Sequence, residues 1–114
     1  MIKQGEIHLV DLNPTIGSEI SKTRPCLVVS ADDIGILPLK VVAPITEYKP
    51  HYEEVPWMVN LKPNSTNKLL KLSVVDAFQL RSISNERIVK RIGVLTRVEF
   101  LQVIEAIKIV LGIY

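Results

Sequence analysis

Short apolar runs, rich in valine, isoleucine and leucine, recur along this chain, and each is ended by a proline, a glycine or a polar loop. Runs of this length and composition are typical of β-strands. In 5–12 the apolar residues Ile7 and Leu9 alternate with Glu6 and His8, which places His8 on the polar face of the first strand. We therefore expect strands at 5–12, 27–29, 39–46, 54–61, 72–77 and 78–83, the last of them separate or a bent continuation of the one before.

Prolines limit three of these strands, because proline has no N–H to donate to a strand ladder. Pro25 stands where a strand can start, and it pushes the preceding Arg24 toward an extended backbone at the mouth of that strand. We expect Pro44 to end the third strand, with Thr46 at its exit. Pro56 predicts that the fourth strand is an edge strand or contains a bulge.

The clearest helix signal lies near the C-terminus, where Thr96 and Glu99 form a capping box that satisfies free backbone N–H groups. The apolar stripe that follows at helical spacing consists of Phe100, Val103, Ile104, Ile107, Val110 and Leu111. A short helix is also expected over 85–91, with Ser84 as its cap and Gly93 as its stop. The expected fold is α+β and mainly β: a small antiparallel, barrel-like sheet with a C-terminal helix and one short helix.

At 114 residues the chain has room for one hydrophobic core, and we expect a single domain over 1–114. Hydrophobic residues make up 47% and aromatic residues 5% of the chain, so the core must be mostly aliphatic. A net charge of +2 is too small to indicate nucleic-acid binding by itself. The lone cysteine, the absence of an apolar run of ~20 residues and the lack of a signal-peptide pattern predict a soluble, cytoplasmic protein outside the membrane.

Motifs for metals and cofactors are absent from the sequence. The two histidines, His8 and His51, are far apart, and neither they nor Cys26 have zinc-type spacing. The chain has no glycine-rich phosphate loop of the G-x-x-x-x-G-K type and no G-x-S-x-G nucleophile motif. We therefore expect no metal and no cofactor, and the remaining candidates for chemistry are polar side chains at strand ends.

A series of fixed spacings carries more information than any single motif. The segments Gly5-Glu6-Ile7, Val10-Asp11-Leu12, Pro14, Gly17-Ser18-Glu19 and Thr23-Arg24-Pro25 together resemble the opening of the MazF/PemK family of toxin endoribonucleases. The resemblance continues to about Arg87 through Ser73-Val74-Val75 and Gln79-Leu80-Arg81-Ser82-Ile83. It implies an SH3-like barrel, a two-fold dimer, and sequence-specific, metal-independent cleavage of single-stranded RNA.

In the MazF branch of this family, the arginine of the R-P motif and the threonine after the third strand are the catalytic pair, and they match Arg24 and Thr46. RNA is cleaved without metal when the 2′-hydroxyl attacks its own phosphate, leaving a 2′,3′-cyclic phosphate and a 5′-hydroxyl. The protein must align the reacting groups and stabilise charge on the phosphate oxygens, which suits arginine. The resemblance thus implies that Arg24 stabilises the phosphate, with proton transfer as an alternative role, and that Thr46 orients the phosphate or the 2′-hydroxyl. The general base stays open, with Glu19 as the nearest carboxylate in sequence.

Further polar residues are predicted to line the RNA groove, and each has a structural alternative. Ser73 and Gln79 follow from the resemblance, but Ser73 also suits a structural role, and Gln79 and Arg81 can tie the sheet together. Ser18 and Glu19 can instead make turn hydrogen bonds. His51 can stack on bases or be an ordinary loop histidine. The full predicted RNA-binding set is Ser18, Glu19, Lys22, Lys49, His51, Lys71, Ser73 and Gln79.

Some positions depart from the family pattern. His8 stands where tryptophan is common, and Ser84 stands where aspartate is common. The PemK branch uses an arginine and an aspartate before its Q-P-R-T-I segment, whereas this chain has Asp76 and Phe78 at those positions. We therefore follow the assignment of the MazF branch.

The resemblance also implies an antitoxin partner whose acidic, flexible tail fills the RNA groove. The basic residues that would attract this tail are Lys22, Arg24, Lys49 and Lys71. Two other functions stay open. A CcdB-like toxin would bind DNA gyrase, but that family uses a C-terminal Trp-Gly-Ile, whereas this chain ends in Leu-Gly-Ile-Tyr. A catalytically silent module of the same fold would bind RNA and leave it intact.

Overall fold

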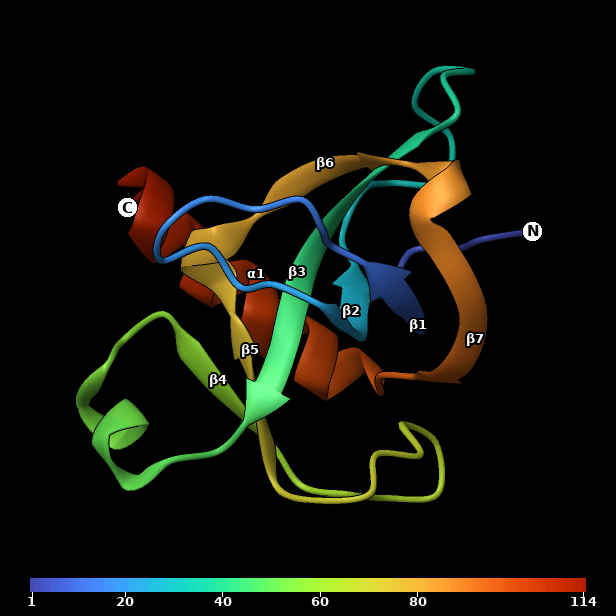
Figure 1. Ribbon diagram of the computed structural model, residues 1–114. Helices are drawn as coiled ribbons and strands as arrows, with labels where there is room; N and C mark the ends of the chain where they lie inside the picture. The colour runs from blue at the N-terminus through green and yellow to red at the C-terminus, as the bar shows by residue number, and fades with distance from the viewer.

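The computed structural model describes residues 1–114 (Figure 1). It consists of an antiparallel sheet, one α-helix and three short 3-10 helices, here called η1 to η3. In chain order the elements are β1 (Glu6–Asp11), β2 (Thr23–Val28), β3 (Leu39–Glu47), η1 (Pro50–Glu54), β4 (Met58–Leu61), β5 (Ser73–Asp76), η2 (Ala77–Gln79), β6 (Arg81–Ser84), η3 (Asn85–Arg87), β7 (Ile88–Val94) and α1 (Arg97–Leu111). The expected α+β, mainly β fold with a C-terminal helix is confirmed.

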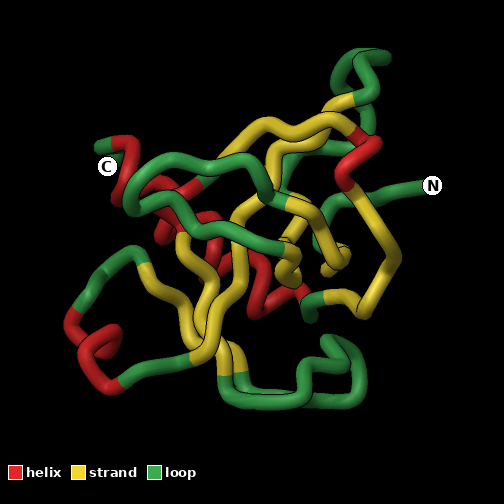
Figure 2. Tube along the Cα trace, viewed as in Figure 1, coloured by secondary structure: helices red, strands yellow, loops and turns green.

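All seven strands belong to one sheet in the order β4-β5-β3-β2-β1-β7, with β6 paired to β3, and all pairs are antiparallel. The end strands β4 and β7 do not pair with each other, so the sheet is open rather than a closed barrel. In Figure 1, α1 lies behind the sheet, while the long loop between β1 and β2 crosses in front of it; Figure 2 shows this loop in green. The sheet is therefore covered by the helix on one side and by this loop on the other.

Strand β3 is the longest strand, and it organises the sheet. One side of it pairs with β2 through residues 42–44, and its other side pairs with β6 and then with β5. The expectation that Pro44 ends this strand is wrong, because β3 continues to Glu47. Pro44 is tolerated because it lies where pairing with β2 ends and pairing with β5 begins. Since β5 and β6 follow the same side of β3 and are joined by η2, 78–83 is a bent continuation of β5.

The fourth strand is an edge strand, as Pro56 predicts, but it is shorter than expected. Residues 50–54 form η1 rather than the start of a strand, and β4 begins only at Met58. Pro50 occupies the first turn of η1, where its fixed backbone angle suits a helical turn.

The C-terminal helix begins as the sequence predicts. The Thr96 hydroxyl accepts a hydrogen bond from the Glu99 N–H at 3.2 Å, and the Glu99 carboxylate accepts one from the Thr96 N–H at 2.9 Å. The predicted stripe is buried or half-buried except for Leu111, which is 60% exposed because it is the last residue before the left-handed Gly112. Ala106 lies in the core instead, since its small side chain lets the helix approach the sheet.

The expected helix over 85–91 is wrong. Only Asn85–Arg87 form a helical turn, η3, in which the Ser84 hydroxyl accepts a hydrogen bond from the Glu86 N–H as predicted. The chain then continues as β7, which pairs with β1, and Gly93 lies inside that strand rather than at a helix end. A Cβ at Gly93 would stand 2.5 Å from the carbonyl oxygen of Asn67, so this glycine permits the close approach of a loop.

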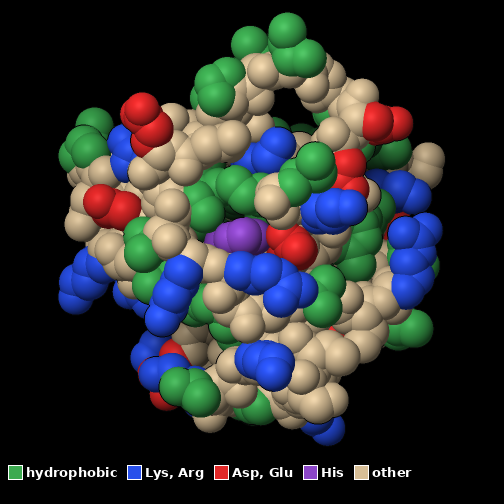
Figure 3. All heavy atoms as spheres, turned by 90° about the vertical axis from the view of Figure 1, so that its right-hand side faces the viewer, with side chains coloured by type: hydrophobic (Ala, Val, Ile, Leu, Met, Phe, Trp, Pro, Cys, Tyr) green, Lys and Arg blue, Asp and Glu red, His purple; other side chains and the backbone are tan.

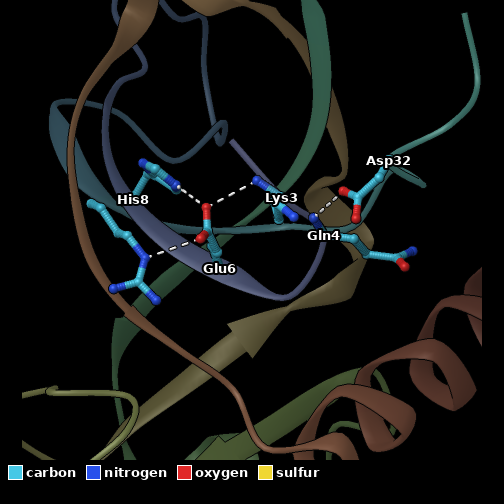
Figure 4. Close-up of polar contacts among 6 residues, drawn as sticks. Lys3, Gln4, Glu6, His8 and Asp32 are labelled. Atoms are coloured by element: carbon cyan, nitrogen blue, oxygen red, sulfur yellow. Dashed lines mark hydrogen bonds and ion pairs between the residues drawn. The ribbon is translucent and has the colours of Figure 1, made fainter. Parts of the chain in front are cut away.

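His8 lies on the same side of β1 as Glu6, as predicted, since the two side chains are hydrogen-bonded, but it is only 5% exposed. Both sides of β1 pack against buried clusters, one containing Ile7 and the other Val10. On the face of the molecule in Figure 3, histidine and acidic side chains lie side by side near the centre, with basic side chains next to them. Figure 4 shows Glu6 accepting hydrogen bonds from His8 Nε2 at 3.0 Å and from the Lys3 N–H at 2.9 Å, and Arg91 Nε donates to the same carboxylate at 3.0 Å. We call Glu6, His8 and Arg91 the Glu6 cluster.

No helix of the chain has the length and apolarity that crossing a bilayer would require.

Candidate active site

The sheet brings Arg24 and Thr46 together, although they are 22 residues apart in sequence. Arg24 is the second residue of β2, held extended before Pro25, and Thr46 is the second-last residue of the neighbouring strand β3. Arg24 Nη1 lies 3.5 Å from the Thr46 hydroxyl oxygen, and Arg24 Nε donates to the Ser21 carbonyl at 2.9 Å. The arginine side chain is therefore held by the loop while one edge of its guanidinium meets a hydroxyl.

The Arg24 charge has no acidic partner. Four ion pairs are present in the protein, and none of them includes Arg24. Its contact with Thr46 is at the long limit of a hydrogen bond, and the side chain is half-buried. A positively charged group with unused N–H donors at such a site is suited to bind a phosphate or carboxylate.

The loop between β1 and β2, residues 12–22, is fixed onto the sheet by Gln79 and two arginines. Gln79 Oε1 accepts a hydrogen bond from the Ile20 N–H at 2.6 Å, and its Nε2 donates to the Ser18 carbonyl at 3.2 Å. Arg81 Nη1 donates to the Leu12 carbonyl at 2.6 Å, and Arg87 donates to the carbonyl of Asn13. The Gln79 amide thus ties the sheet to the loop, which is the structural alternative for this residue.

The loop also stabilises itself through its own residues. The Glu19 carboxylate accepts a hydrogen bond from the Ile16 N–H at 2.6 Å, which is a turn contact, while Ser18 is exposed. Lys22 has a φ of 71°, a left-handed conformation that is uncommon for lysine. Its N–H donates to the Asn13 side chain at 3.1 Å, and its carbonyl accepts from the Leu12 N–H at 3.0 Å, so contacts within the loop hold it there.

An open hollow of about 440 Å³ lies between this loop and the β3 and β5–β6 region of the sheet. It is lined by Leu12, Ser18, Glu19, Ile20, Val42, Pro44, Phe78, Gln79, Leu80 and Arg81. The turn η2 presents Phe78 and Gln79, and Asp76 caps this turn by accepting a hydrogen bond from the Phe78 N–H at 3.0 Å. Burial raises the pKa of Asp76, although the backbone N–H groups of Phe78 and Gln79 act in the opposite direction.

Cys26 is a buried thiol on β2. Burial raises the pKa of the Cys26 thiol to about 12, while the charges of Arg81 and Arg24 oppose that rise. The thiol itself stays protonated at neutral pH and has little nucleophilic character.

The other predicted RNA-binding residues form no hydrogen bond or ion pair with Arg24 or Thr46. Ser73 is buried, and its hydroxyl donates to the Lys71 carbonyl at 2.9 Å, so it has a structural role. The exposed Lys71 ammonium lies 3.4 Å from the Glu47 carboxylate, one residue after Thr46. Lys49 caps η1 without a side-chain bond, and His51 packs against Tyr52 with ring centroids 4.4 Å apart. The sheet end beside Thr46 thus carries Lys71, whereas Lys49 and His51 belong to the next loop.

Two residues of the site have roles that the sequence alone did not assign: Arg87 as a support of the loop, and Phe78 as a wall of the hollow. Arg81, which the sequence suggests as a residue that ties the sheet together, is bonded to the loop. The only sequence signal for Arg87 is its place at the end of the family-like segment that begins at Gln79. Phe78 had no signal beyond being aromatic. No three of the chain's His, Cys, Asp and Glu side chains come together in a group that could hold a metal ion.

Known proteins were compared with the chain by sequence and by structure. Residues 3–111 match the family model described as PemK-like, MazF-like toxin of type II toxin–antitoxin system. The chain is 31% identical to endoribonuclease MazF9 of Mycobacterium tuberculosis over 118 aligned positions, covering 100% of this chain and 99% of that protein. It is 30% identical to endoribonuclease MazF of Staphylococcus epidermidis over 114 positions, covering 99% of this chain and 93% of that protein.

Solved structures give the same fold. A mycobacterial endoribonuclease in complex with its cognate antitoxin superposes with a TM-score of 0.79 at 18% identity, covering 100% of this chain and 98% of that one. MazF from Deinococcus radiodurans superposes with a TM-score of 0.79 at 24% identity, covering 97% and 96%. At these identities the structural match establishes the fold alone.

Proposed function

Because the chain belongs to the PemK-like, MazF-like family of toxins of type II toxin–antitoxin systems, we propose that it is a sequence-specific endoribonuclease that cleaves single-stranded RNA. Its substrate would be messenger RNA in the cytoplasm. One contact supports the location of the active site: on two neighbouring strands, the Arg24 guanidinium meets the Thr46 hydroxyl. Arg24 has no acidic partner that would neutralise its charge.

The reaction is an in-line displacement at phosphorus. The 2′-oxygen forms a bond to the phosphorus atom, the bond from phosphorus to the 5′-oxygen breaks, and the products are a 2′,3′-cyclic phosphate and a 5′-hydroxyl. The 2′-hydroxyl loses its proton to a base, and the leaving 5′-oxygen takes up a proton. Negative charge accumulates on the non-bridging oxygens in between, so a fixed guanidinium lowers the barrier.

Arg24 supplies that guanidinium. Its planar guanidinium presents several N–H donors, so its role is charge stabilisation through hydrogen bonds to the phosphate oxygens. The bond from Nε to the Ser21 carbonyl fixes the side chain, so little reorganisation is needed when the phosphate arrives. Thr46 donates its hydroxyl to the phosphate or to the attacking oxygen, and Glu19 is a candidate for the base, with one carboxylate oxygen already bonded to the Ile16 N–H.

The partner of this toxin would be an antitoxin whose acidic tail occupies the same electropositive groove as the RNA, and the active form would be a homodimer. The related mycobacterial endoribonuclease has been solved in complex with its cognate antitoxin. A carboxylate-rich tail is a suitable competitor, because the Arg24 guanidinium binds carboxylates and phosphates through the same N–H groups.

The test is cleavage of a long single-stranded RNA in excess EDTA by the purified protein, with the ends mapped. We expect cuts at one recurring short sequence with 5′-hydroxyl ends. Arg24→Ala should cut the RNA roughly 10²- to 10³-fold more slowly, whereas Lys90→Ala, which removes an exposed charge in no ion pair, should cleave like the wild type. Uncut RNA from folded, antitoxin-free wild-type protein, or equal cleavage by Arg24→Ala, would contradict the proposal.

A further inference from the structure

Phe78 is an exposed aromatic residue that the proposed cleavage step does not use. It is 59% exposed, and its ring packs against Trp57, with ring centroids 5.2 Å apart and an angle of 53° between the planes. Trp57 is half-buried and packs against the main core, so it supports the Phe78 ring in one position. An aromatic surface that is already held in place loses little conformational freedom when a planar ligand stacks on it.

The hollow beside Phe78 has the lining that a nucleobase requires. Its volume of about 440 Å³ is within the range of small-ligand sites. Its apolar walls include Phe78, Pro44 and Leu80, and its polar groups include the exposed Ser18, the Glu19 carboxylate and the Arg81 guanidinium. A base presents two apolar faces and a hydrogen-bonding edge, so it can stack on the walls and bond to these groups at once.

The hollow lies next to the Arg24–Thr46 pair, and two segments of the chain, β3 and the β1–β2 loop, connect them. On β3, Pro44 lines the hollow, and Thr46 lies two residues further on the same face, at a distance of about 7 Å along the strand. In the loop, the Ile20 N–H is bonded to Gln79 at the hollow, and the next residue, Ser21, accepts the hydrogen bond from Arg24. The separation is comparable to one nucleotide step, so a chain with its phosphate at Arg24 can place a neighbouring base in the hollow.

We propose that Phe78, supported by Trp57, is a stacking platform for the base of a nucleotide next to the scissile phosphate, and that this hollow contributes to the sequence preference of cleavage. This inference rests on the proposed function, because it needs single-stranded RNA at Arg24. The aromatic face supplies binding energy for any base, and the polar groups at the edge of the hollow discriminate between bases.

The test compares Phe78→Leu and Phe78→Tyr with the wild type on a pool of RNAs of varied sequence. Leucine keeps the apolar contact with Trp57 but removes the aromatic face, whereas tyrosine keeps that face. Loss of stacking should raise KM roughly 5- to 150-fold in Phe78→Leu, leave kcat nearly unchanged, and weaken the base preference at one position beside the cut. Phe78→Tyr should retain the wild-type KM and preference.

A binding measurement makes the result independent of cleavage. The probe is an RNA of the preferred sequence with a 2′-deoxynucleotide at the cut and 2-aminopurine at the adjacent position. Wild type and Phe78→Tyr should quench its fluorescence on binding, and Phe78→Leu should not. If the wild type cleaves RNA but Phe78→Leu matches it in KM, base preference and quenching, the stacking inference is overturned while the proposed function stands.

Two further results separate the alternatives. A wild type that neither cuts nor binds RNA overturns the proposed function, and the inference with it. If sedimentation shows that Phe78→Leu dissociates a wild-type dimer, and raising the protein concentration restores both assembly and KM, then Phe78 belongs to a subunit contact and the stacking inference is wrong.

Discussion

The Glu6 cluster and the Arg24 site each contain a charged group, Glu6 on β1 and Arg24 on the neighbouring strand β2. They differ in whether that group has an oppositely charged partner. In the Glu6 cluster, one carboxylate accepts hydrogen bonds from His8, from Arg91 and from a backbone N–H, at 2.9 to 3.0 Å (Figure 4). At the Arg24 site, the guanidinium has a backbone carbonyl and a hydroxyl at 3.5 Å, with no carboxylate. The Glu6 carboxylate has its partners within the chain, although His8 Nδ1 is buried without one, whereas the Arg24 guanidinium lacks an anion.

This difference separates stability from function. Hydrogen bonds at 3.0 Å around a nearly buried carboxylate stabilise the folded protein, and removing the carboxylate leaves its donors without a partner. A cation without an acidic partner adds little to the stability of the chain alone, because its strongest interaction awaits a ligand. We therefore expect substitutions in the Glu6 cluster to alter folding and substitutions at the Arg24 site to alter cleavage.

The largest effect should come from Arg24→Ala. Removing a group that stabilises transition-state charge costs roughly 10²- to 10³-fold in kcat, while the free energy of unfolding should fall by only about 0.5–1.5 kcal/mol, from the lost hydrogen bond to the Ser21 carbonyl. Single-turnover cleavage and urea denaturation measure the two quantities. Arg24→Lys is the matched control, and we expect it to recover only part of the rate, since lysine lacks the planar fork. A loss of stability as large as the loss of activity would erase the distinction between the two regions.

The second-largest effect is expected for Glu6→Ala, which should lower stability and leave cleavage unchanged. We expect the free energy of unfolding to fall by about 1–3 kcal/mol, because His8, Arg91 and the Lys3 N–H lose their shared acceptor. The cleavage rate per folded molecule should stay that of the wild type. Glu105→Ala, which breaks only the exposed pair with Lys108, is the control and should change stability by less than about 0.5 kcal/mol. Equal effects of the two substitutions would contradict the role of the Glu6 cluster.

Thr46 tests the finer geometry of the Arg24 site. Thr46→Val keeps the shape of the side chain and removes the hydroxyl, and we expect roughly a tenfold fall in kcat from one lost hydrogen bond to the reacting phosphate. Thr46→Ser keeps the hydroxyl and should remain close to the wild type. Should valine support full activity, the contact of Thr46 with Arg24 would be structural only.

The smallest effect is a pH dependence of stability that originates in the Glu6 cluster. Burial raises the pKa of the Glu6 carboxyl, but the hydrogen bonds from His8, Lys3 and Arg91 lower it, and the result is a pKa below the usual value of 4.5. A lowered pKa contributes stability above pH 4.5, and this contribution is lost as the pH falls through the folded-state pKa. The stability difference between wild type and Glu6→Gln, measured by urea denaturation, should therefore shrink as the pH is lowered below about 4.5. If the stability difference between wild type and Glu6→Gln grew at low pH, the predicted direction of the Glu6 pKa shift would be wrong.

The sequence predicted most of the strands and the capped helix α1 because local signals decide these elements. It failed where tertiary pairing overrides a local pattern. Residues 88–91 form part of β7 because β1 offers an open edge, and Pro44 lies within β3 because the strand changes partners there. His8 is buried although it lies beside Glu6 as the alternation predicts, because that side of β1 also packs against a buried cluster, the one that contains Val10.

The candidate site shows the same division. The family-like spacing placed Arg24 and Thr46 in one site, and the sheet brings them into contact. The sequence could not distinguish groove residues from supports, because that depends on which groups a side chain meets in space. Gln79 is bonded to the loop and Ser73 to its own backbone, whereas Phe78, which had no motif, lies open at the hollow.

The most direct measurement uses two RNAs of the preferred cleavage sequence that differ only in one 2′-hydroxyl, the one beside the scissile phosphate. If Arg24 and Thr46 assist attack by that hydroxyl, the full RNA should be cut to a 2′,3′-cyclic phosphate and a 5′-hydroxyl, while the 2′-deoxy RNA should remain intact yet bind as a competitive inhibitor. Cleavage of the 2′-deoxy RNA at the same position would mean that water is the nucleophile, and it would contradict the proposed mechanism.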